Sequence, residues 1–381
     1  MLKCDMENFE YRNKCEILFG QLPEGDVATA LKRHGAKNVL IVFGSDRIKE
    51  SGLFGKITDG IKFEGIKFTE FGGVVANPSL KHANEGVEIA RKNKVDFVLA
   101  IGGGSVIDAA KFIAVGAAGG NAEKIFKGDT DGVKAIPMAA VLTLPAAGSE
   151  ASNSSVIRDD ISGEKISLTA ECIRPRFAFI NPTYCMTLPK EQIAYGASDI
   201  FAHLLERYFC PQDNIVFTDK LLEGAMKAML EIAPKLYNDP SDYQLWAEFC
   251  LIGTIAHNSM LSMGRVIQDW GVHNIENKLL SGIQNIAHGA GLAILFPAWM
   301  KHVSKTKPQK IQQFTREVIG IDELQKFYRG LGLAQTLSEL NIDAEIVKRD
   351  ATKIYPQGTI LGGYGQIGVG DILEIINICA R

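Results

Sequence analysis

The chain has 381 residues, which is enough for two domains of ordinary size. With 46% hydrophobic residues, 22% charged residues and a net charge of −3, it has the composition of a globular protein and no electrostatic footprint for nucleic acid or an anionic membrane. No apolar run approaches the roughly 20 residues that span a bilayer. The seven cysteines contain no CxxC pair, which favours reduced thiols in a cytoplasmic protein.

Apolar runs and amphipathic segments alternate along the first half of the chain. The segment DFVLAIGGG is apolar until it ends in glycine, which is typical of a strand buried on both faces of a parallel sheet. The βαβα order predicts a doubly wound α/β domain, with a glycine-rich loop at 119–133. The runs that predict strands are 38–44, 65–74, 96–104, 135–147 and 166–182.

The composition changes near residue 184, and long segments with helical periodicity follow. DKLLEGAMKAMLEIAPKLY and DYQLWAEFCLIGTIAHNSML are examples of these segments. We therefore predict an α/β domain over residues 1–184 and an all-α domain over residues 185–381.

The segment AIGGGSVIDAAK places three glycines between a predicted strand and a predicted helix. Glycines without Cβ atoms let a backbone approach a pyrophosphate, and the helix N-terminus offers free N–H groups. Gly103, Gly104 and Ser105 are the resulting candidates, although the pattern is neither GxGxxG nor a P-loop. A tight strand-to-helix turn without a ligand is the alternative.

Polar residues near this loop have two interpretations each. Asp108 either stabilises the helix N-terminus or lies near a bound nicotinamide ribose or carboxamide. Thr143, at the carboxyl end of the next strand, either bonds a cofactor or belongs to a plain turn. Lys111 is interpreted as a solvated or pairing lysine.

One carboxylate and three histidines in the second half could form a metal site. Asp199 and His203 are four residues apart in a helical segment, so they share one face. Together with His273 and His288 they offer a plausible ligand set for a divalent transition metal. His257 is more simply explained as a core histidine.

Several ordered motifs together resemble the iron-containing (group III) alcohol dehydrogenase family. They are GGGSVIDAAK, TLPAAGSEAS, YGASDIFAHLLE and the spaced His273 and His288, and the similarity covers nearly the whole chain. The branch of NAD(P)H-dependent butanol dehydrogenases and aldehyde reductases is the most similar, because it shares the TLPAAGSE-like loop and the opening MENFEY.

The resemblance implies a Rossmann-like dinucleotide-binding domain followed by a helical metal-binding domain, as in the dehydroquinate synthase-like architecture. It implies a homodimer, and it implies Asp199, His203, His273 and His288 as ligands of one Fe²⁺ or Zn²⁺. The cofactor positions that it implies are Gly103, Gly104, Ser105, Asp108, Thr143, Leu144 and Lys165.

The chain departs from the family pattern at two places. Family members commonly have a second histidine four residues after the first, near the nicotinamide, and this chain has Asn277 there. Asn277 is thus a predicted catalytic position that cannot titrate near neutral pH, which leaves the proton path open. The spacing from His273 to His288 is also one residue longer than expected, and we place the extra residue in the SGIQN loop.

The choice between NADP and NAD depends on the residues after the first predicted strand. Our register places Ser45 at the discriminating position, so Gly44 and Ser45 followed by Arg47 could accommodate a 2′-phosphate. Asp46 would repel that phosphate if it pointed inward. The sequence slightly favours NADP.

These features predict a metal-dependent alcohol dehydrogenase or aldehyde reductase that acts on a primary alcohol or aldehyde such as butanol or butanal. A polyol (glycerol-type) dehydrogenase on the same fold is the alternative, and a non-catalytic nucleotide or metal sensor is another. A dehydroquinate-synthase-like lyase would need several basic groups near the site, and only Arg207 and Arg265 are obvious candidates.

Overall fold

The computed structural model describes residues 6–212 and 215–381 and divides into two compact units. The α/β unit is Asn13–Thr187, and the helical unit is Leu188–Arg381 together with the described residues before Asn13. The sequence predicted the division after residue 184. Glu7 shows why the start of the chain belongs to the helical unit, because its carboxylate accepts hydrogen bonds from Gln212 Nε2 at 2.9 Å and from the Val266 amide at 3.0 Å.

The α/β unit is built on one parallel sheet, in the order β1-β8-β5-β4-β2-β3. All of its strand pairs are parallel. The doubly wound fold predicted from the alternation of apolar runs and helices is therefore confirmed. The strands of this sheet are β1 Glu16–Phe19, β2 Asn38–Phe43, β3 Lys67–Phe71, β4 Phe97–Gly103, β5 Met138–Leu144 and β8 Phe177–Ile180.

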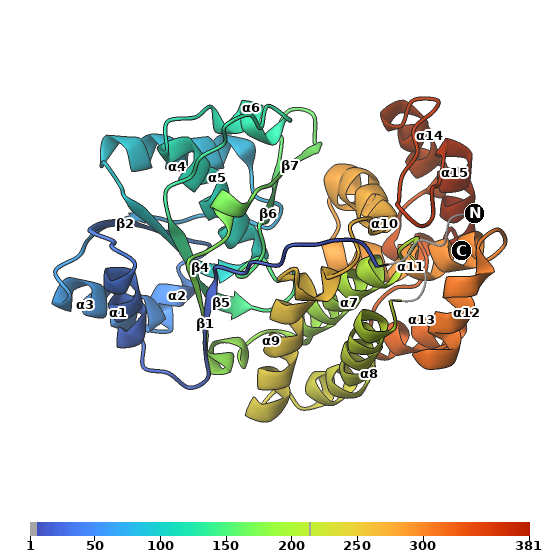
Figure 1. The fold of residues 1–381 in the computed structure, drawn as a ribbon, viewed down its shortest axis with the longest axis horizontal. Coiled ribbons are helices and arrows are strands. Elements are labelled where there is room, and N and C mark those ends of the chain that lie inside the picture. The colour runs from blue at the N-terminus through green and yellow to red at the C-terminus, as the bar shows by residue number, and fades with distance from the viewer. Residues whose placement is uncertain (1–5, 213–214) are drawn as a thin grey trace. The chain divides into compact units, whose positions relative to one another are not determined.

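Helices cover both faces of this sheet, with α1 and α3 on one face and α4 and α5 on the other (Figure 1). Val39, Ile41 and Phe43 of β2 pack with the core that α1 and α3 share. The intervening Leu40 and Val42 are equally buried, as a strand covered on both sides requires. The helices of this unit are α1 Gly25–Arg33, α2 Arg47–Glu50, α3 Leu53–Phe63, α4 Leu80–Lys92, α5 Gly104–Ala117, α6 Ala122–Phe126, η1 Glu171–Ile173 and η2 Pro182–Cys185.

Two predictions for this unit were wrong in detail. The segment predicted as the last strands, 166–182, separates into β7 (Lys165–Thr169) and β8, and only β8 joins the parallel sheet. β7 pairs antiparallel with β6 (Ser154–Arg158) in a separate hairpin. The predicted loop 119–133 contains α6, whose N-cap Asn121 accepts a hydrogen bond from the Lys124 amide.

The helical unit confirms the prediction of an all-α second domain. α8 and α9 correspond to the two long periodic segments. In the described part of the chain no helix is long and apolar enough to cross a membrane. The helices are α7 Lys190–Tyr208, α8 Val216–Asn238, α9 Tyr243–His257, η3 Met260–Ser262, α10 Gly271–Ile275, the π-helix η4 Glu276–Gln284, α11 His288–Val303, α12 Pro308–Glu317, α13 Ile321–Gly330, η5 Ser338–Leu340, α14 Ala344–Ile354 and α15 Val369–Ile378.

Candidate functional site

Helix α7 carries the first two predicted metal ligands, Asp199 and His203, into the core of the helical unit. The helix begins directly after Pro189, which has no backbone N–H to donate to a preceding helical turn. Both side chains are buried, and their spacing of four places them on one face. Asp199 Oδ1 lies 3.3 Å from His203 Nδ1.

The other two predicted ligands lie at the starts of helices in the same unit. His273 is in α10, and His288 is the first residue of α11. Asp199 Oδ1 is 3.9 Å from His273 Nε2 and 3.7 Å from His288 Nε2. One ligand atom each of Asp199, His273 and His288 lie within 4.8 Å of one another, and the His203 ring centroid is 4.8 Å from that of His273. The structure therefore brings all four residues into one cluster.

The inward-facing atoms of this cluster fit a divalent metal ion. Asp199 Oδ1, His203 Nδ1 and His273 Nε2 are buried, and none has a hydrogen-bond partner among the described residues. A buried polar atom without a partner costs roughly 1–3 kcal/mol, so several that converge on one point are suited to binding a cation. One carboxylate with three imidazoles suits Fe²⁺ or Zn²⁺.

Two buried glutamates lie behind the histidines, and the sequence reasoning missed both. Glu206 Oε1 is 2.8 Å from His273 Nδ1, and Glu276 Oε2 contacts His288 Nδ1. An ionised carboxylate only accepts hydrogen bonds, so each Nδ1 donates to its glutamate and each Nε2 is the ring atom left to face a metal. A signal was available, because each glutamate lies three residues after a predicted ligand, at His203 and at His273.

Burial and neighbouring charges shift the pKa values of His203 and His273 in opposite directions. Burial, followed by the neighbouring rings of His257 and His273, holds the pKa of His203 well below its usual range, which keeps its imidazole neutral. Burial also lowers the pKa of His273, but the carboxylates of Asp199 and Glu206 outweigh this effect and raise it to about 9. The cluster thus provides a strongly negative environment for a cation at His273.

The two arginines near the cluster are already engaged by the chain itself. Arg207 donates to the His203 carbonyl at 2.9 Å and lies over the Trp270 ring at 4.9 Å. Arg265 donates to the Arg207 carbonyl at 2.9 Å and pairs with Asp219. Neither guanidinium is available to hold a substrate carboxylate or phosphate, which disfavours the lyase alternative.

Two further polar residues of this unit have defined places. Asn277 lies in the π-helix η4, four residues after His273, and is half-buried. The His257 ring lies edge-on to the His203 ring, with centroids 4.3 Å apart. His257 therefore packs against a predicted ligand, and Asn277 remains a predicted catalytic position.

In the α/β unit, most of the predicted cofactor positions lie at the carboxyl ends of three adjacent strands. Gly44 follows β2, Gly103 ends β4, and Thr143 and Leu144 end β5. A Cβ atom at Gly103 would lie 2.9 Å from Leu144 Cβ, so only glycine permits this close approach. This is the edge at which open α/β sheets bind ligands.

Helix α5 begins at Gly104, and no side chain of the described residues caps its N-terminus. A Cβ atom at Gly104 would lie 3.1 Å from Ala147 Cβ, so the loop after β5 closes against this helix end. Ser105 follows in the first turn. The free amides of that turn are suited to a pyrophosphate.

Asp108 and Lys111 hold the loop after β5 in place. Asp108 accepts hydrogen bonds from Ser149 Oγ at 2.6 Å and from the Val156 amide at 3.1 Å. Burial raises the pKa of Asp108 against the opposing charges of Lys111 and Lys165, which places Lys165 nearby. The structure thus gives Asp108 a structural role, and its contact with the nicotinamide stays a prediction.

Lys111 was interpreted as a solvated or a pairing lysine, and because it is fully buried the first of these interpretations was wrong. Its ammonium donates to the carbonyls of Ser149 at 2.7 Å, Ser152 at 3.1 Å and Ser154 at 2.7 Å. It also reaches the hydroxyls of Ser149 and Ser152. Oxygen atoms of the backbone, rather than solvent, compensate this buried charge.

The residues predicted to select NADP or NAD are accessible to a ligand. Ser45, Asp46 and Arg47 are exposed directly after β2, and Lys49 Nζ lies 3.6 Å from Asp46 Oδ1. Both candidate side chains, Ser45 and Asp46, can therefore face a bound ribose.

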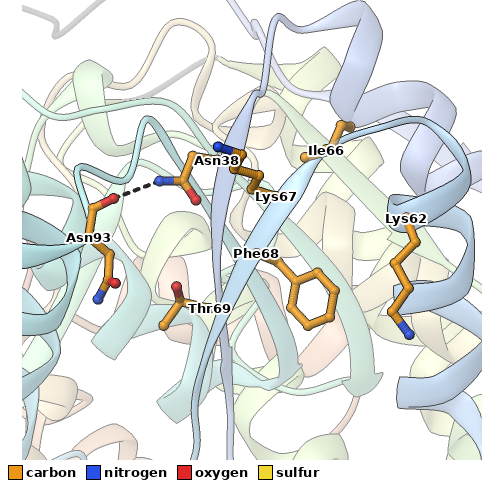
Figure 2. Close-up of a pocket in the computed structure, with 7 residues that line it drawn as sticks. All are labelled: Asn38, Lys62, Ile66, Lys67, Phe68, Thr69 and Asn93. Atoms are coloured by element: carbon orange, nitrogen blue, oxygen red, sulfur yellow. Dashed lines mark hydrogen bonds between the residues drawn. The ribbon is translucent and has the colours of Figure 1, made fainter.

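A surface hollow of about 550 Å³ lies elsewhere on the α/β unit. Asn38 and Lys67, the first residues of β2 and β3, line it, and Figure 2 shows the Asn38 amide bonded to the Asn93 carbonyl. These are the amino ends of the strands, opposite to the edge that carries Gly44 and Gly103. The hollow is not part of the predicted cofactor site.

Comparisons with known proteins agree with this arrangement. The family model described as iron-containing alcohol dehydrogenase matches residues 15–182, and the model of the C-terminal part of the Fe-containing alcohol dehydrogenase family matches residues 193–379. The chain is 36% identical to a probable NADH-dependent butanol dehydrogenase of Bacillus subtilis, over 97% of this chain and 99% of that protein. It is 32% identical to the NADPH-dependent aldehyde reductase YqhD of Escherichia coli, over 93% and 94% of the two chains.

A solved structure shows the same fold over both units. The crystal structure of NADH-dependent butanol dehydrogenase A from Thermotoga maritima superposes with a TM-score of 0.94 at 33% identity, covering 99% of this chain and 100% of that one. The two family models together span nearly the whole chain. The chain therefore belongs to the iron-containing alcohol dehydrogenase family.

Proposed function

We propose that this chain is a metal-dependent, NAD(P)H-linked alcohol dehydrogenase and aldehyde reductase that interconverts primary alcohols and aldehydes such as butanol and butanal. The observation that carries the proposal is the cluster of Asp199, His203, His273 and His288, in which the buried atoms Asp199 Oδ1, His203 Nδ1 and His273 Nε2 lack hydrogen-bond partners among the described residues. The relatives named for butanol dehydrogenase or aldehyde reductase activity, at 32–36% identity over nearly the whole chain, supply the substrate class.

Each group of residues has a separate task in this reaction. Asp199 and the three histidines hold the metal, and Gly103, Gly104 and Ser105 hold the cofactor pyrophosphate at the start of α5. A divalent metal held there would supply polarisation of the substrate oxygen, and a bound nicotinamide would supply or accept the hydride. The amide of Asn277 can hydrogen-bond a substrate or a water molecule, but it cannot carry a proton by titrating.

We further propose Fe²⁺ or Zn²⁺ as the metal, NADP in preference to NAD, and a homodimer as the assembly. The preference for NADP rests on exposed Ser45 and on Arg47 after β2. A reduced, cytoplasmic setting is consistent with the free thiols of the six cysteines in the described part of the chain.

The proposal is tested by metal analysis of the purified protein together with paired assays of NADPH and NADH. Absorbance at 340 nm is followed with butanal, and in the reverse direction with butanol and with glycerol. Cofactor oxidation by butanal supports the reductase. Turnover restricted to glycerol would identify a polyol dehydrogenase. No turnover with either cofactor in metal-loaded protein would leave a nucleotide or metal sensor as the explanation.

A further inference from the structure

His288 is the most accessible of the four predicted ligands. Its side chain is 26% exposed, whereas those of Asp199, His203 and His273 are 6–8% exposed. As the first residue of α11, it has no preceding helical turn to restrict its ring. Something else must therefore fix the direction in which its Nε2 points.

Glu276 contacts His288 from the adjacent helix η4. The Glu276 side chain is fully buried, which is costly for a carboxylate unless polar groups compensate it. One of its oxygens, Oε2, contacts both His288 Nδ1 and the hydroxyl of Ser281, the latter at 2.9 Å. The carboxylate also lies against the first turn of α11, where an anion is favoured.

The π-helix explains how Glu276 and Ser281 meet. In a π-helix the residue at i+5 lies above residue i, because each backbone hydrogen bond spans one residue more than in an α-helix. Ser281 is five residues after Glu276, and its hydroxyl also approaches the Glu276 carbonyl at 3.5 Å. Residues 281–284 of the predicted SGIQN loop belong to this π-helix, so the prediction of a loop there was wrong, and the position of the extra residue stays a prediction.

Helix α11 has a gap for the Glu276 side chain. A Cβ atom at Gly291 would lie 2.7 Å from Glu276 Oε1 and 2.9 Å from its Cγ. Gly291 is three residues after His288, so both lie on the same face of α11. His288 and Gly291 together line the space that the Glu276 carboxylate occupies.

We propose that Glu276 is a positioning residue that holds the Nδ1–H of His288, so that His288 Nε2 stays directed at the metal position. The inference rests on the proposed metal site and deepens it. Glu206 makes the equivalent contact with His273, but it also accepts hydrogen bonds from the backbone amides of Trp270 and His273. Trp270 has a left-handed backbone with φ of 58°, so Glu206 additionally stabilises a strained turn. Among the described residues no backbone amide donates to the Glu276 carboxylate, so Glu276 gives the cleaner test.

The test compares metal affinity in Glu276→Ala, Glu276→Gln and the wild type, measured on the metal-loaded protein by competition with a chromogenic chelator. We expect Glu276→Ala to bind Zn²⁺ roughly 10–100-fold more weakly, the range typical of such supporting groups. Glu276→Gln should lose less, because its amide oxygen still accepts a hydrogen bond. Cobalt-substituted protein provides a second readout, because its visible absorption bands should shift when the His288 ring is released.

Two further variants separate positioning from general stability. Gly291→Ala keeps every polar group but intrudes on Glu276, so it should weaken Zn²⁺ binding in the same direction, and it carries the test if Glu276→Ala does not fold. Glu223→Gln is the matched control, because Glu223 is a buried carboxylate of the same unit that bonds Tyr208 and Lys220 instead of a ligand.

The outcomes distinguish this inference from the proposed function. If the wild type binds no divalent metal, the metal site itself is refuted. If the wild type binds Zn²⁺ and both Glu276→Ala and Gly291→Ala bind it equally well, with unchanged cobalt spectra, only the positioning role is refuted.

Discussion

Asp199 Oδ1 lies 3.3 Å from His203 Nδ1 across one turn of α7, and neither atom has a hydrogen-bond partner among the described residues. Either side chain could adopt a rotamer that points toward another polar group. Both side chains also lie against His273, and Asp199 approaches His288, as the predicted ligand set requires.

His203→Ala should therefore lose metal and turnover together. Removal of a ligand should weaken metal binding by at least roughly 100-fold, the upper end of the effect of supporting groups. Metal content by mass spectrometry and activity with butanal are measured on the same sample. His302→Ala is the control, because His302 pairs with Asp371 at 2.8 Å instead of facing the cluster. A His203→Ala protein with full metal content would refute the assignment.

Gly103→Ala should weaken cofactor binding. The new Cβ atom would lie 2.9 Å from Leu144 Cβ, so the ends of β4 and β5 must separate where the pyrophosphate is predicted to bind. We expect the KM for NADPH to rise about tenfold, which corresponds to about 1.4 kcal/mol, while the stability falls by about 1–3 kcal/mol.

The matched control for Gly103 is Gly55→Ala in α3, where a Cβ atom would meet nothing within 4 Å. That change should stabilise the helix by about 0.5–1 kcal/mol and leave the KM unchanged. Equal KM values in Gly103→Ala and the wild type would remove Gly103 from the cofactor site.

Ser45→Asp should shift the cofactor preference toward NADH. Ser45 is exposed directly after β2, at the position predicted to face the 2′-phosphate. A carboxylate there would repel that phosphate but could bond a free 2′-hydroxyl. We expect kcat/KM for NADPH to fall about tenfold, equivalent to about 1.4 kcal/mol, with little change for NADH.

Asp46→Asn tests the alternative that Asp46, instead of Ser45, faces the 2′ position of the ribose. If Asp46 is the residue that faces the ribose, this change alone should improve NADPH turnover, and Ser45→Asp should affect both cofactors similarly. Parallel measurements with the two cofactors therefore decide which of the two side chains reads the 2′ position.

The sequence alone predicted the features that depend on short-range patterns. The buried strands β2, β4 and β5 are continuous apolar runs, and the spacing of Asp199 and His203 follows from helical periodicity. The positions of Gly103 and Leu144 follow from parallel strands that share a carboxyl edge. These features need no knowledge of which segments pack together.

Features that depend on tertiary packing were not predicted. Glu206 and Glu276 each follow a predicted ligand by three residues, but only their burial behind His273 and His288 reveals which ligands they contact. Residues 281–284 were assigned to a loop, because sequence periodicity does not distinguish a π-helix from an interrupted α-helix. The antiparallel pairing of β7 with β6 was missed, because β6 alternates half-buried and buried residues and has no continuous apolar run.

Lys111→Met should destabilise the α/β unit. Methionine fills a similar volume but leaves the carbonyls of Ser149, Ser152 and Ser154 without their donor in a buried place. We expect the free energy of unfolding to fall by about 3 kcal/mol near pH 7, as when one partner of a buried charged network is removed. Urea unfolding followed by circular dichroism measures this loss, and a change within 0.5 kcal/mol, about the size of a surface substitution, would contradict the structural role.

The same variant tests how the stability depends on pH. Burial lowers the pKa of Lys111 from 10.5 to about 8, although the charges of Asp108 and Glu150 oppose this effect. Between these two values the unfolded chain holds a proton that the folded chain has released, so the contribution of Lys111 to stability rises with pH in this window. Below pH 8 both states are protonated, and the cost of burying the charge is present in full. The difference in unfolding free energy between the wild type and Lys111→Met should therefore grow from pH 8 to pH 10 by at most about 1.4 kcal/mol per pH unit. A flat difference across this range would mean that Lys111 keeps its proton in the folded protein.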